Sequence, residues 1–237
     1  MTITIQGVGV VGGFGCGVQD LARAMDRDAG PAPTALRIDP TTLRIDPAAL
    51  RADPSPLDRF VPRRGQRRMD RLSRLAALAA HLALEDAGAL ADDHSRLGLV
   101  LASGFGATGT TLALIDSIIE GGDPCASPIH FAGSLHNAAA AHLAILLGAR
   151  GPSLTVSQFH LSVGSALLAA RLWLDQGRVD RVLFGAVDEL SELTGHLWAR
   201  QGELERPLGP AGAPPGEGAA CFLLSSRAEA QPAYAIL

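Results

Sequence analysis

The sequence predicts an α/β fold in which helices cover both sides of a mixed β-sheet. Alternating or continuous apolar runs, typical of strands, occupy residues 2–11, 97–102, 153–157, 181–187 and 219–225. Stretches with the apolar spacing of helices lie between these runs, and glycines end several of them. Strands that alternate with helices along one chain are typical of α/β domains.

The composition allows one sizeable core and excludes several kinds of chemistry. The chain has 237 residues, of which 47% are hydrophobic and 19% charged, so we expect a single domain over residues 1–237. The net charge of −4 gives no reason to expect a nucleic-acid partner. All 20 basic residues are arginines, which excludes a lysine Schiff base, a P-loop lysine and a lysine-bound pyridoxal phosphate.

Targeting and metal signals are also missing from the sequence. No apolar run approaches the ~20 residues that span a bilayer, and the N-terminus does not resemble a secretory signal. Cys16, Cys125 and Cys221 are an odd, scattered set without metal-ligand spacing. We therefore expect a soluble cytoplasmic protein with no membrane partner, no metal and no cofactor.

The N-terminal elements are a strand at 2–11 and a short helix at 20–25. Gly7-Val-Gly-Val-Val-Gly12 has the spacing of a dinucleotide-binding turn, but no second strand with an acidic end follows it. A glycine turn that packs the strand on a helix is therefore favoured. Residues 29–62 are rich in Pro and Asp and contain a Leu-Arg-Ile-Asp-Pro repeat. Proline at the ends of each repeat forbids a continuous helix, so we expect turns in a surface excursion.

The clearest predicted helix covers residues 66–88 and begins within an arginine cluster. The spacing of the arginines predicts that four of them share one helix face: Arg64, Arg67, Arg68 and Arg71. One interpretation is a solvated face partly neutralised by Asp58 and Asp70. The other is a binding surface for an acidic partner or a phosphate.

A glycine-rich turn at 103–109 precedes a helix expected at 111–120. An alanine-rich helix expected at 137–147 should be buried, because its small side chains permit another backbone to approach closely. A further helix is expected at 162–174, and a Pro/Gly loop at 204–218. The spacing of four histidines matches no metal site, so core or interface positions are favoured for His130, His136, His142 and His160.

The segment Ser157-Gln-Phe-His160 joins a predicted strand to a predicted helix. In α/β proteins such a turn can present a nucleophile at a helix N-terminus. Gln158, Phe159 and His160 occupy the turn here, and none of them is a cysteine. His160 is therefore either a general base or a side chain that fills a former nucleophile pocket.

The sequence resembles the N-terminal half of a β-ketoacyl synthase, a condensing enzyme of the thiolase-like fold. The matching segments follow the family's order along nearly all of the chain. They include Gly7-Val-Gly-Val-Val, Arg67-Arg-Met-Asp-Arg71, Ala83-Leu-Glu-Asp-Ala-Gly88, Gly104-Phe-Gly, Leu135-His-Asn137, Arg150-Gly-Pro-Ser-Leu-Thr-Val-Ser157 and Gly216-Glu-Gly-Ala-Ala220. The resemblance implies a thiolase-like half, with a mixed sheet layered with helices.

Two departures from the family concern catalysis. In the family a cysteine nucleophile follows the strand that ends here at Ser157, and counting without gaps places His160 at that position. The family's two downstream histidines belong to a second half, which this sequence does not reach at Leu237. A Claisen condensation needs the thiolate and polarisation of the malonyl group. The resemblance therefore implies a chain that has no catalytic residues and is not itself an enzyme.

A ketosynthase-like chain without its nucleophile resembles a chain length factor, the silent subunit of type II polyketide and aryl polyene ketosynthase pairs. The resemblance implies a heterodimer with an active β-ketoacyl-ACP synthase, contact with acyl carrier protein, and a share in the partner's acyl tunnel. The implied tunnel wall is Leu112, Ile115, Ile118 and Ile119. The implied interface is Phe131, His136, Asn137 and Ala141, with the alanine-rich helix and strand 153–157. The implied carrier-docking residues are Arg63, Arg64, Arg67 and Arg68.

Other interpretations remain open at this stage. Apolar residues four apart, such as Ile115 and Ile119, are usually ordinary core, and Asn137 is also a candidate helix N-cap. The fold family also permits a homodimer. Two rival functions are a small hydrolase or malonyl-thioester decarboxylase that uses His160 with Gln158, and a scaffold that only keeps the synthase folded.

Overall fold

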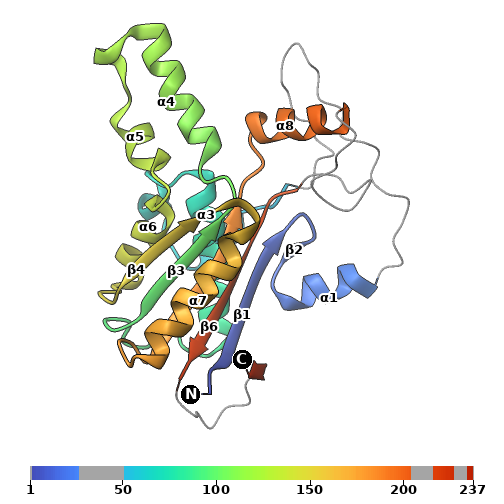
Figure 1. Ribbon diagram of the computed structural model, residues 1–237, viewed down its shortest axis with the longest axis vertical. Coiled ribbons are helices and arrows are strands. Elements are labelled where there is room, and N and C mark those ends of the chain that lie inside the picture. The colour runs from blue at the N-terminus through green and yellow to red at the C-terminus, as the bar shows by residue number, and fades with distance from the viewer. Residues whose placement is uncertain (1, 27–50, 204–215, 227–233, 237) are drawn as a thin grey trace.

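The computed structural model describes residues 2–26, 51–203, 216–226 and 234–236, with residues 198–203 described by their backbone alone. In this part of the chain one seven-stranded mixed sheet has the order β2-β1-β6-β5-β3-β4, and β7 also pairs with β1 (Figure 1). The strands are β1 (Thr4–Gly12), β2 (Gly15–Cys16), β3 (Gly98–Ser103), β4 (Ser153–Ser157), β5 (Arg181–Asp188), β6 (Gly218–Ser225) and β7 (Ala235–Ile236).

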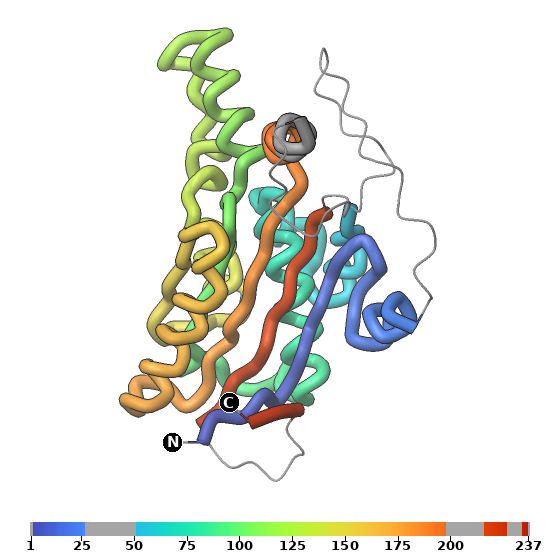
Figure 2. The backbone as a smooth tube through the Cα atoms, turned by 45° about the vertical axis from the view of Figure 1, so that its right-hand side comes forward, coloured from blue at the N-terminus to red at the C-terminus, as the bar shows by residue number. Residues whose placement is uncertain are grey.

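Helices cover both faces of this sheet, as the sequence predicts. α3 and α6 pack on one face and α7 on the other (Figures 1 and 2). The helices are α1 (Val18–Asp26), α2 (Arg63–Gln66), α3 (Arg71–Asp86), α4 (Thr108–Gly121), α5 (Pro128–Ser134), α6 (Ala138–Leu147), α7 (Ser162–Asp175) and α8 (Glu192–Glu203). Figure 2 shows α4 and α5 projecting beyond the end of the sheet. We call these two helices the arm.

The strand β1 and the helix α3 are in backbone contact. Gly7 and Gly9 lie inside β1, and a Cβ atom on either would overlap a carbonyl oxygen of α3, that of Ala83 or of Ala79. The predicted packing of a glycine-rich strand against a helix is therefore present. The glycines achieve it from within the strand and not from a turn, because the chain reverses only at Gly12–Gly15.

The two faces of the sheet carry separate cores. The larger core joins α3 and α6 to the sheet, with Leu75, Leu78 and Leu143 fully buried. The smaller core lies under α7 and is centred on Val100, Ala170 and Phe184. No helix among the described residues combines the length and apolar character needed to span a membrane.

The long helix predicted at 66–88 is wrong in its first turns. α2 ends at Gln66, and α3 starts only at Arg71, with Asp70 as its N-cap: the Asp70 carboxylate accepts a hydrogen bond from Ser73 N at 2.6 Å. A capping carboxylate competes with helix continuation and starts a new helix instead. The arginines at 64, 67, 68 and 71 therefore do not share one helix face.

Several short elements are absent from the sequence prediction: β2, the 3₁₀ helix Ser55–Arg59, α5, α8 and β7. The alanine-rich helix α6 is only half buried, because Ala141 and Ile145 on its outer face are exposed. In the predicted excursion 29–62, residues 29–50 lie outside the described residues, while Leu57 and Val61 lie in the core. Most of the predicted loop 204–218 also lies outside them.

Candidate functional site

The turn from β4 to α7 has the strained geometry of a nucleophile elbow. Phe159 has φ of 50°, the one positive value among the described residues that are not glycine. Ser162 at the start of α7 holds the turn: its hydroxyl accepts a hydrogen bond from Gln158 N at 2.7 Å. The same hydroxyl lies 2.9 Å from Ser103 O and 2.7 Å from Phe159 O.

His160 stands isolated on this turn. Its side chain is exposed and makes no hydrogen bond with another described residue. The Gln158 side chain is engaged elsewhere, because its amide oxygen accepts a hydrogen bond from Ser165 Oγ at 2.8 Å. Phe159 is 65% exposed and its ring meets the edge of Phe105, with centroids 5.8 Å apart. Among the described residues, His160 therefore has no partner that would orient it as a general base.

The glycine-rich turn after β3 is held by acidic residues at the end of β5. The carboxylate of Asp188 accepts hydrogen bonds from Ser103 Oγ at 2.7 Å, Gly104 N at 2.8 Å and Phe105 N at 3.0 Å. Glu189 accepts one from Gly109 N at 2.8 Å. β3 and β5 are parallel neighbours, so their carboxyl ends meet at one edge of the sheet. Two acidic residues after a buried strand were the sequence signal for this contact, which the sequence prediction missed.

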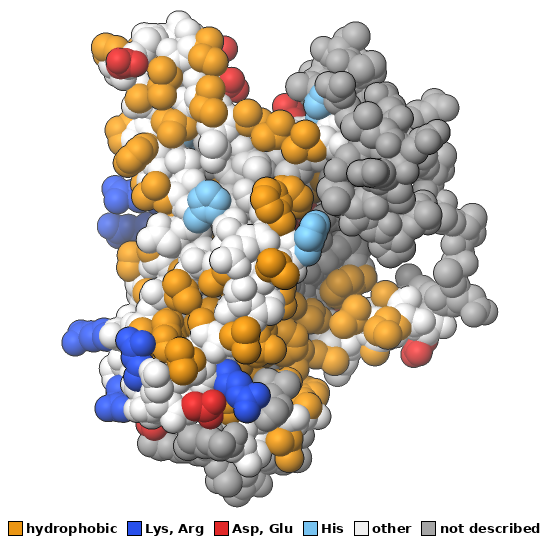
Figure 3. All heavy atoms as spheres, viewed as in Figure 1, with side chains coloured by type: hydrophobic (Ala, Val, Ile, Leu, Met, Phe, Trp, Pro, Cys, Tyr) orange, Lys and Arg blue, Asp and Glu red, His pale blue; other side chains and the backbone are white. Residues whose placement is uncertain are grey.

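The arm exposes apolar side chains along its length, as Figure 3 shows at the upper left. No residue of α4 is buried in this chain. Ile115 is 44% exposed and Ile119 is 74% exposed, while Leu112 and Ile118 are half-buried. The interpretation of Ile115 and Ile119 as ordinary core is therefore wrong.

The four interface candidates are all exposed: Phe131, His136, Asn137 and Ala141. Phe131 lies on α5, His136 and Asn137 lie between α5 and α6, and Ala141 is on the outer face of α6. The His136 ring stands against Gly106, where an added Cβ would lie 3.1 Å from it. Asn137 occupies the N-cap position of α6, as the alternative expected, but its side chain makes no capping hydrogen bond.

The arginine cluster divides into paired and unpaired members. Arg63 pairs with Asp58 at 3.0 Å, and Arg71 turns inward to the buried Glu217, with Nε 2.9 Å from Oε2. Within the described ranges, ion pairs are absent from three exposed arginines: Arg64, Arg67 and Arg68.

Glu217 and Glu189 form a buried acidic pair beside Arg71. Glu217 also accepts hydrogen bonds from Ala52 N at 2.9 Å and Leu190 N at 3.0 Å. Burial tends to raise the pKa of Glu217, but the hydrogen bonds from Arg71 and the backbone together hold that pKa below its usual value. Burial raises the pKa of Glu189. The hydrogen bond from Gly109 N and the positive charge of Arg71 lower this pKa, but by less than burial raises it.

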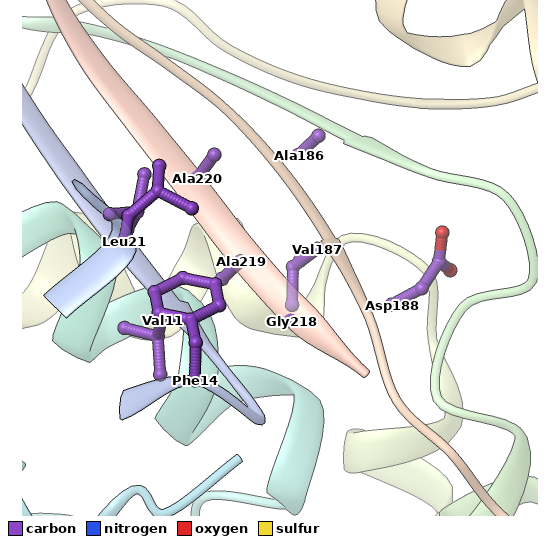
Figure 4. A pocket seen from close by; sticks show the side chains of 10 residues that line it. Val11, Phe14, Leu21, Ala186, Val187, Asp188, Gly218, Ala219 and Ala220 are labelled. Carbon is purple, nitrogen blue, oxygen red and sulfur yellow. The ribbon is translucent and has the colours of Figure 1, made fainter. Parts of the chain in front are cut away.

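An open recess of about 360 Å³ lies over the ends of β1, β5 and β6 (Figure 4). Its lining is apolar apart from Asp188, and it includes Val10, Phe14, Leu21, Ala186 and Ala220. None of the site residues predicted from the sequence lines this recess. Elsewhere in the described part of the chain, no group of three or more His, Cys, Asp or Glu side chains could hold a metal ion.

The family model for the β-ketoacyl synthase N-terminal domain matches residues 34–230. The chain belongs to this family. Nodulation protein E from Rhizobium leguminosarum bv. trifolii is 32% identical over 130 residues, which are 54% of this chain and 32% of that protein. The matched part of this chain therefore covers about a third of the length of that curated relative.

Solved structures place this chain in the thiolase-like fold. The ishigamide ketosynthase/chain length factor matches with a TM-score of 0.76 and 25% identity, covering 100% of this chain and 66% of that one. A chain from the structure of the Xenorhabdus doucetiae ketosynthase ApeO in complex with its chain length factor ApeC matches with a TM-score of 0.64 and 19% identity. That match covers 99% of this chain and 81% of the other.

The three cysteines of this chain lie away from the β4–α7 turn. Cys221 is buried in β6, and burial raises its pKa to about 12. Cys16 is partly buried in β2, where burial and then Asp20 raise its pKa. Cys125 is exposed between α4 and α5. A thiol with a raised pKa is a poor nucleophile, because the thiolate is the reactive form.

Proposed function

We propose that this chain is a non-catalytic chain length factor, which pairs with an active β-ketoacyl-ACP synthase and helps to wall its acyl tunnel in polyene or polyketide assembly. The observation that carries the proposal is the elbow between β4 and α7. It keeps the strained backbone at Phe159 but holds the isolated His160, and the sequence from 157 to 162 contains no cysteine. Thioester formation at this turn requires a thiolate.

Exposed apolar side chains support a permanent partner. They lie on the arm (Ile119 and Phe131), on α6 (Ile145) and on α7 (Leu168). Apolar exposure on this scale is typical of obligate interfaces and costly in a free subunit. A ketosynthase is the favoured partner, because ApeO of X. doucetiae is a ketosynthase in complex with its chain length factor.

The outward isoleucines of α4 support a role in setting product length. Ile115 and Ile119 are one helical turn apart, so both project from the same side of the arm. In the proposed complex these side chains close the far end of the partner's tunnel, together with Leu112 and Ile118. Side-chain bulk at a tunnel wall limits how far a growing chain extends before it clashes.

The unpaired arginines support contact with acyl carrier protein. Arg64, Arg67 and Arg68 are exposed and make no ion pair with another described residue. Arg63 is also exposed, although Asp58 partly satisfies it. An arginine surface of this kind attracts an acidic carrier protein and steers its approach.

The decisive experiment has two stages. The tagged chain is purified from its own cells, and co-eluting proteins are identified by mass spectrometry after size-exclusion chromatography. We expect a one-to-one complex with a ketosynthase that has its own cysteine. In that complex, Ile119→Phe should shorten the acyl product and Ile119→Ala should lengthen it. Ile236→Ala, at an exposed isoleucine in β7, is the matched control and should leave product length unchanged.

Other outcomes would favour the rival functions. A fall in yield at constant product length would leave the chain as a scaffold for the synthase. Decarboxylation of malonyl thioesters by the isolated chain, lost in His160→Ala, would favour an enzyme that uses the elbow histidine. A stable species that never contains a ketosynthase would contradict the proposal as a whole.

A further inference from the structure

The arm helix α4 starts without a cap of its own. The first N–H groups of any helix have no acceptor within the helix. The N-cap residue of α4 is Ala107, whose side chain cannot accept a hydrogen bond. Thr108 N donates to the nearby Gly106 O at 2.9 Å, but Gly109 N has its acceptor in a distant part of the chain.

The missing cap comes from the connection between β5 and α8. Glu189 Oε1 accepts the hydrogen bond of Gly109 N at 2.8 Å, and the hydroxyls of Ser191 and Thr108 are 2.7 Å apart. Glu189 is 6% exposed, so its carboxylate is fixed by its surroundings and not by solvent. An added Cβ at Gly109 would lie 3.2 Å from Glu189 Oε1, which shows how closely the backbone approaches this carboxylate.

The contacts at the first residues of α4, Thr108 and Gly109, help to set the direction of this helix. No residue of α4 is buried, and its main packing partner is α5, the other helix of the arm. Contacts between α4 and α5 move with the arm, and the arm meets the rest of the chain through α8, which contacts α4, and α6, which contacts α5. The bonds at Thr108 and Gly109 join α4 to the sheet, and Asp188 anchors the turn that precedes them.

We infer that Glu189 is a positioning residue for the tunnel wall: it caps α4 from outside the helix and sets the angle at which Ile115 and Ile119 stand. The part of this inference that concerns product length rests on the function proposed above. The part that concerns the helix does not. A carboxylate at a helix N-terminus also complements the helix dipole, which suits this residue to the role.

The charges around Glu189 explain which substitution is the control. Asp70 and Glu217 add negative charge to this region, and Arg71 is engaged by Glu217. Glu189→Gln removes the charge but keeps a carbonyl oxygen for Gly109 N. Glu189→Leu has a similar size but offers no acceptor, so the pair of variants separates capping from charge.

Hydrogen–deuterium exchange on the isolated full-length chain tests the cap directly. In Glu189→Leu we expect exchange across residues 108–114 to be about tenfold faster, because these amides lose their anchor, with α7 unchanged. Glu189→Gln should exchange like the native chain. Equal exchange in the native and Leu chains, or equal acceleration in the Gln and Leu variants, would overturn the inference.

A milder variant covers the case in which Glu189→Leu does not fold. Thr108→Val keeps the shape of the side chain and removes only the hydroxyl that contacts Ser191. It should accelerate exchange over the same residues by a smaller factor. Native exchange rates in this variant, in the absence of a folded Leu variant, would also overturn the inference.

Product length in the ketosynthase complex separates this inference from the proposed function. Glu189→Leu should turn one dominant product length into a mixture, and Glu189→Gln should restore the single length. If Ile119→Phe changes length and Glu189→Leu does not, the positioning role fails and the wall function stands. If neither changes length, the wall function fails and the exchange experiment alone decides the capping role.

Discussion

The two edges of the central sheet differ in how far their backbone hydrogen-bonding groups are paired. At one edge, the outer side of β1 is closed along its length. β7 pairs with Thr4 and Ile5, and β2 pairs with Val11 and Gly12. Between these short strands, Val8 N donates a hydrogen bond to Asp86 Oδ2 at 2.8 Å, and Val10 O accepts one from Gly17 N at 2.7 Å.

At the other edge, β4 pairs with β3 and has no strand on its outer side in the described part of the chain. Leu99 N donates to Pro152 O and pairs with Ser153, so Leu154 and Val156 direct their backbone groups toward β3. The N–H and C=O groups of the alternate residues therefore point outward: Ser153, Thr155 and Ser157. Exposed apolar side chains on α6 and α7 flank this strand.

The difference shows where a partner is expected. An open strand edge is a template for pairing with another chain, and proteins close the edges that they do not use. In the part of the chain that the structure describes, side chains and short strands close the β1 edge, while β4 stays open. The contrast supports an interface at β4 for the proposed heterodimer, in a position where main-chain hydrogen bonds could join the two sheets.

The largest expected effect is at the open edge. Thr155→Pro removes an outward N–H without touching the bonds to β3, and proline is tolerated on edge strands. We expect affinity for the ketosynthase to fall about a hundredfold while the thermal melting temperature of the free chain changes little. Isothermal titration or native mass spectrometry measures the first quantity and circular dichroism the second.

Thr155→Val is the matched control, because it keeps the N–H and the branched shape. The Thr155 hydroxyl is buried and has no hydrogen-bond partner, so its loss should be neutral. If Thr155→Pro binds the ketosynthase like the native chain, the partner does not pair with β4, and the contrast between the edges loses its meaning.

A smaller effect is expected at the closed edge. Asp86→Ala removes the acceptor of Val8 N and the partner of the Tyr234 hydroxyl, which lies 2.9 Å from Asp86 Oδ1. The free energy of unfolding should fall by about 1 kcal/mol, and self-association should rise as the edge opens. Urea denaturation and analytical ultracentrifugation measure the two changes.

The control at this edge is Asp86→Asn, which keeps an oxygen for Val8 N. It should remain monomeric under the conditions in which the alanine variant associates. A monomeric Asp86→Ala chain would contradict the role of this carboxylate in closing β1.

The smallest expected effect is a change in stability with pH, which two buried histidines produce. Burial lowers the pKa of His81 in α3 and of His94. The unfolded chain therefore binds protons more readily than the folded chain, and stability falls as pH drops through the ordinary histidine range around 6.5. The urea midpoint should decrease between about pH 7 and pH 5, and His94→Gln should flatten that decrease. A midpoint independent of pH would contradict it.

Much of the fold was readable from residue patterns. The strands at 153–157 and 181–187 and the helix at 162–174 agree with β4, β5 and α7 within a residue. These elements have apolar periodicity or continuous apolar runs, and glycines close them. α5 and α8 escaped prediction because they lack a clear apolar stripe. β7 and β2 are two residues each and exist only through pairing with β1.

The site was less predictable because its contacts join distant segments. The acceptors at 188 and 189 meet the turn at 103–109 only when β3 and β5 pair in parallel, which no local pattern reveals. The shared arginine face was wrong because one capping bond at Asp70 divides the helix. The exposure of Ile115 and Ile119 depends on what covers α4, and a sequence does not distinguish an apolar core from an apolar interface.

The backbone contact between β1 and α3 has a mechanical consequence. With Gly7 and Gly9 seated against carbonyl oxygens of α3, strand and helix deform together as one stiff plate. The arm is joined to the body of the fold at two places, the turn at 103–109 and the connection at 135–137 between α5 and α6. A force on the tip of the arm is therefore transmitted to these two connections, and at the turn 103–109 a few hydrogen bonds resist the bending of the arm.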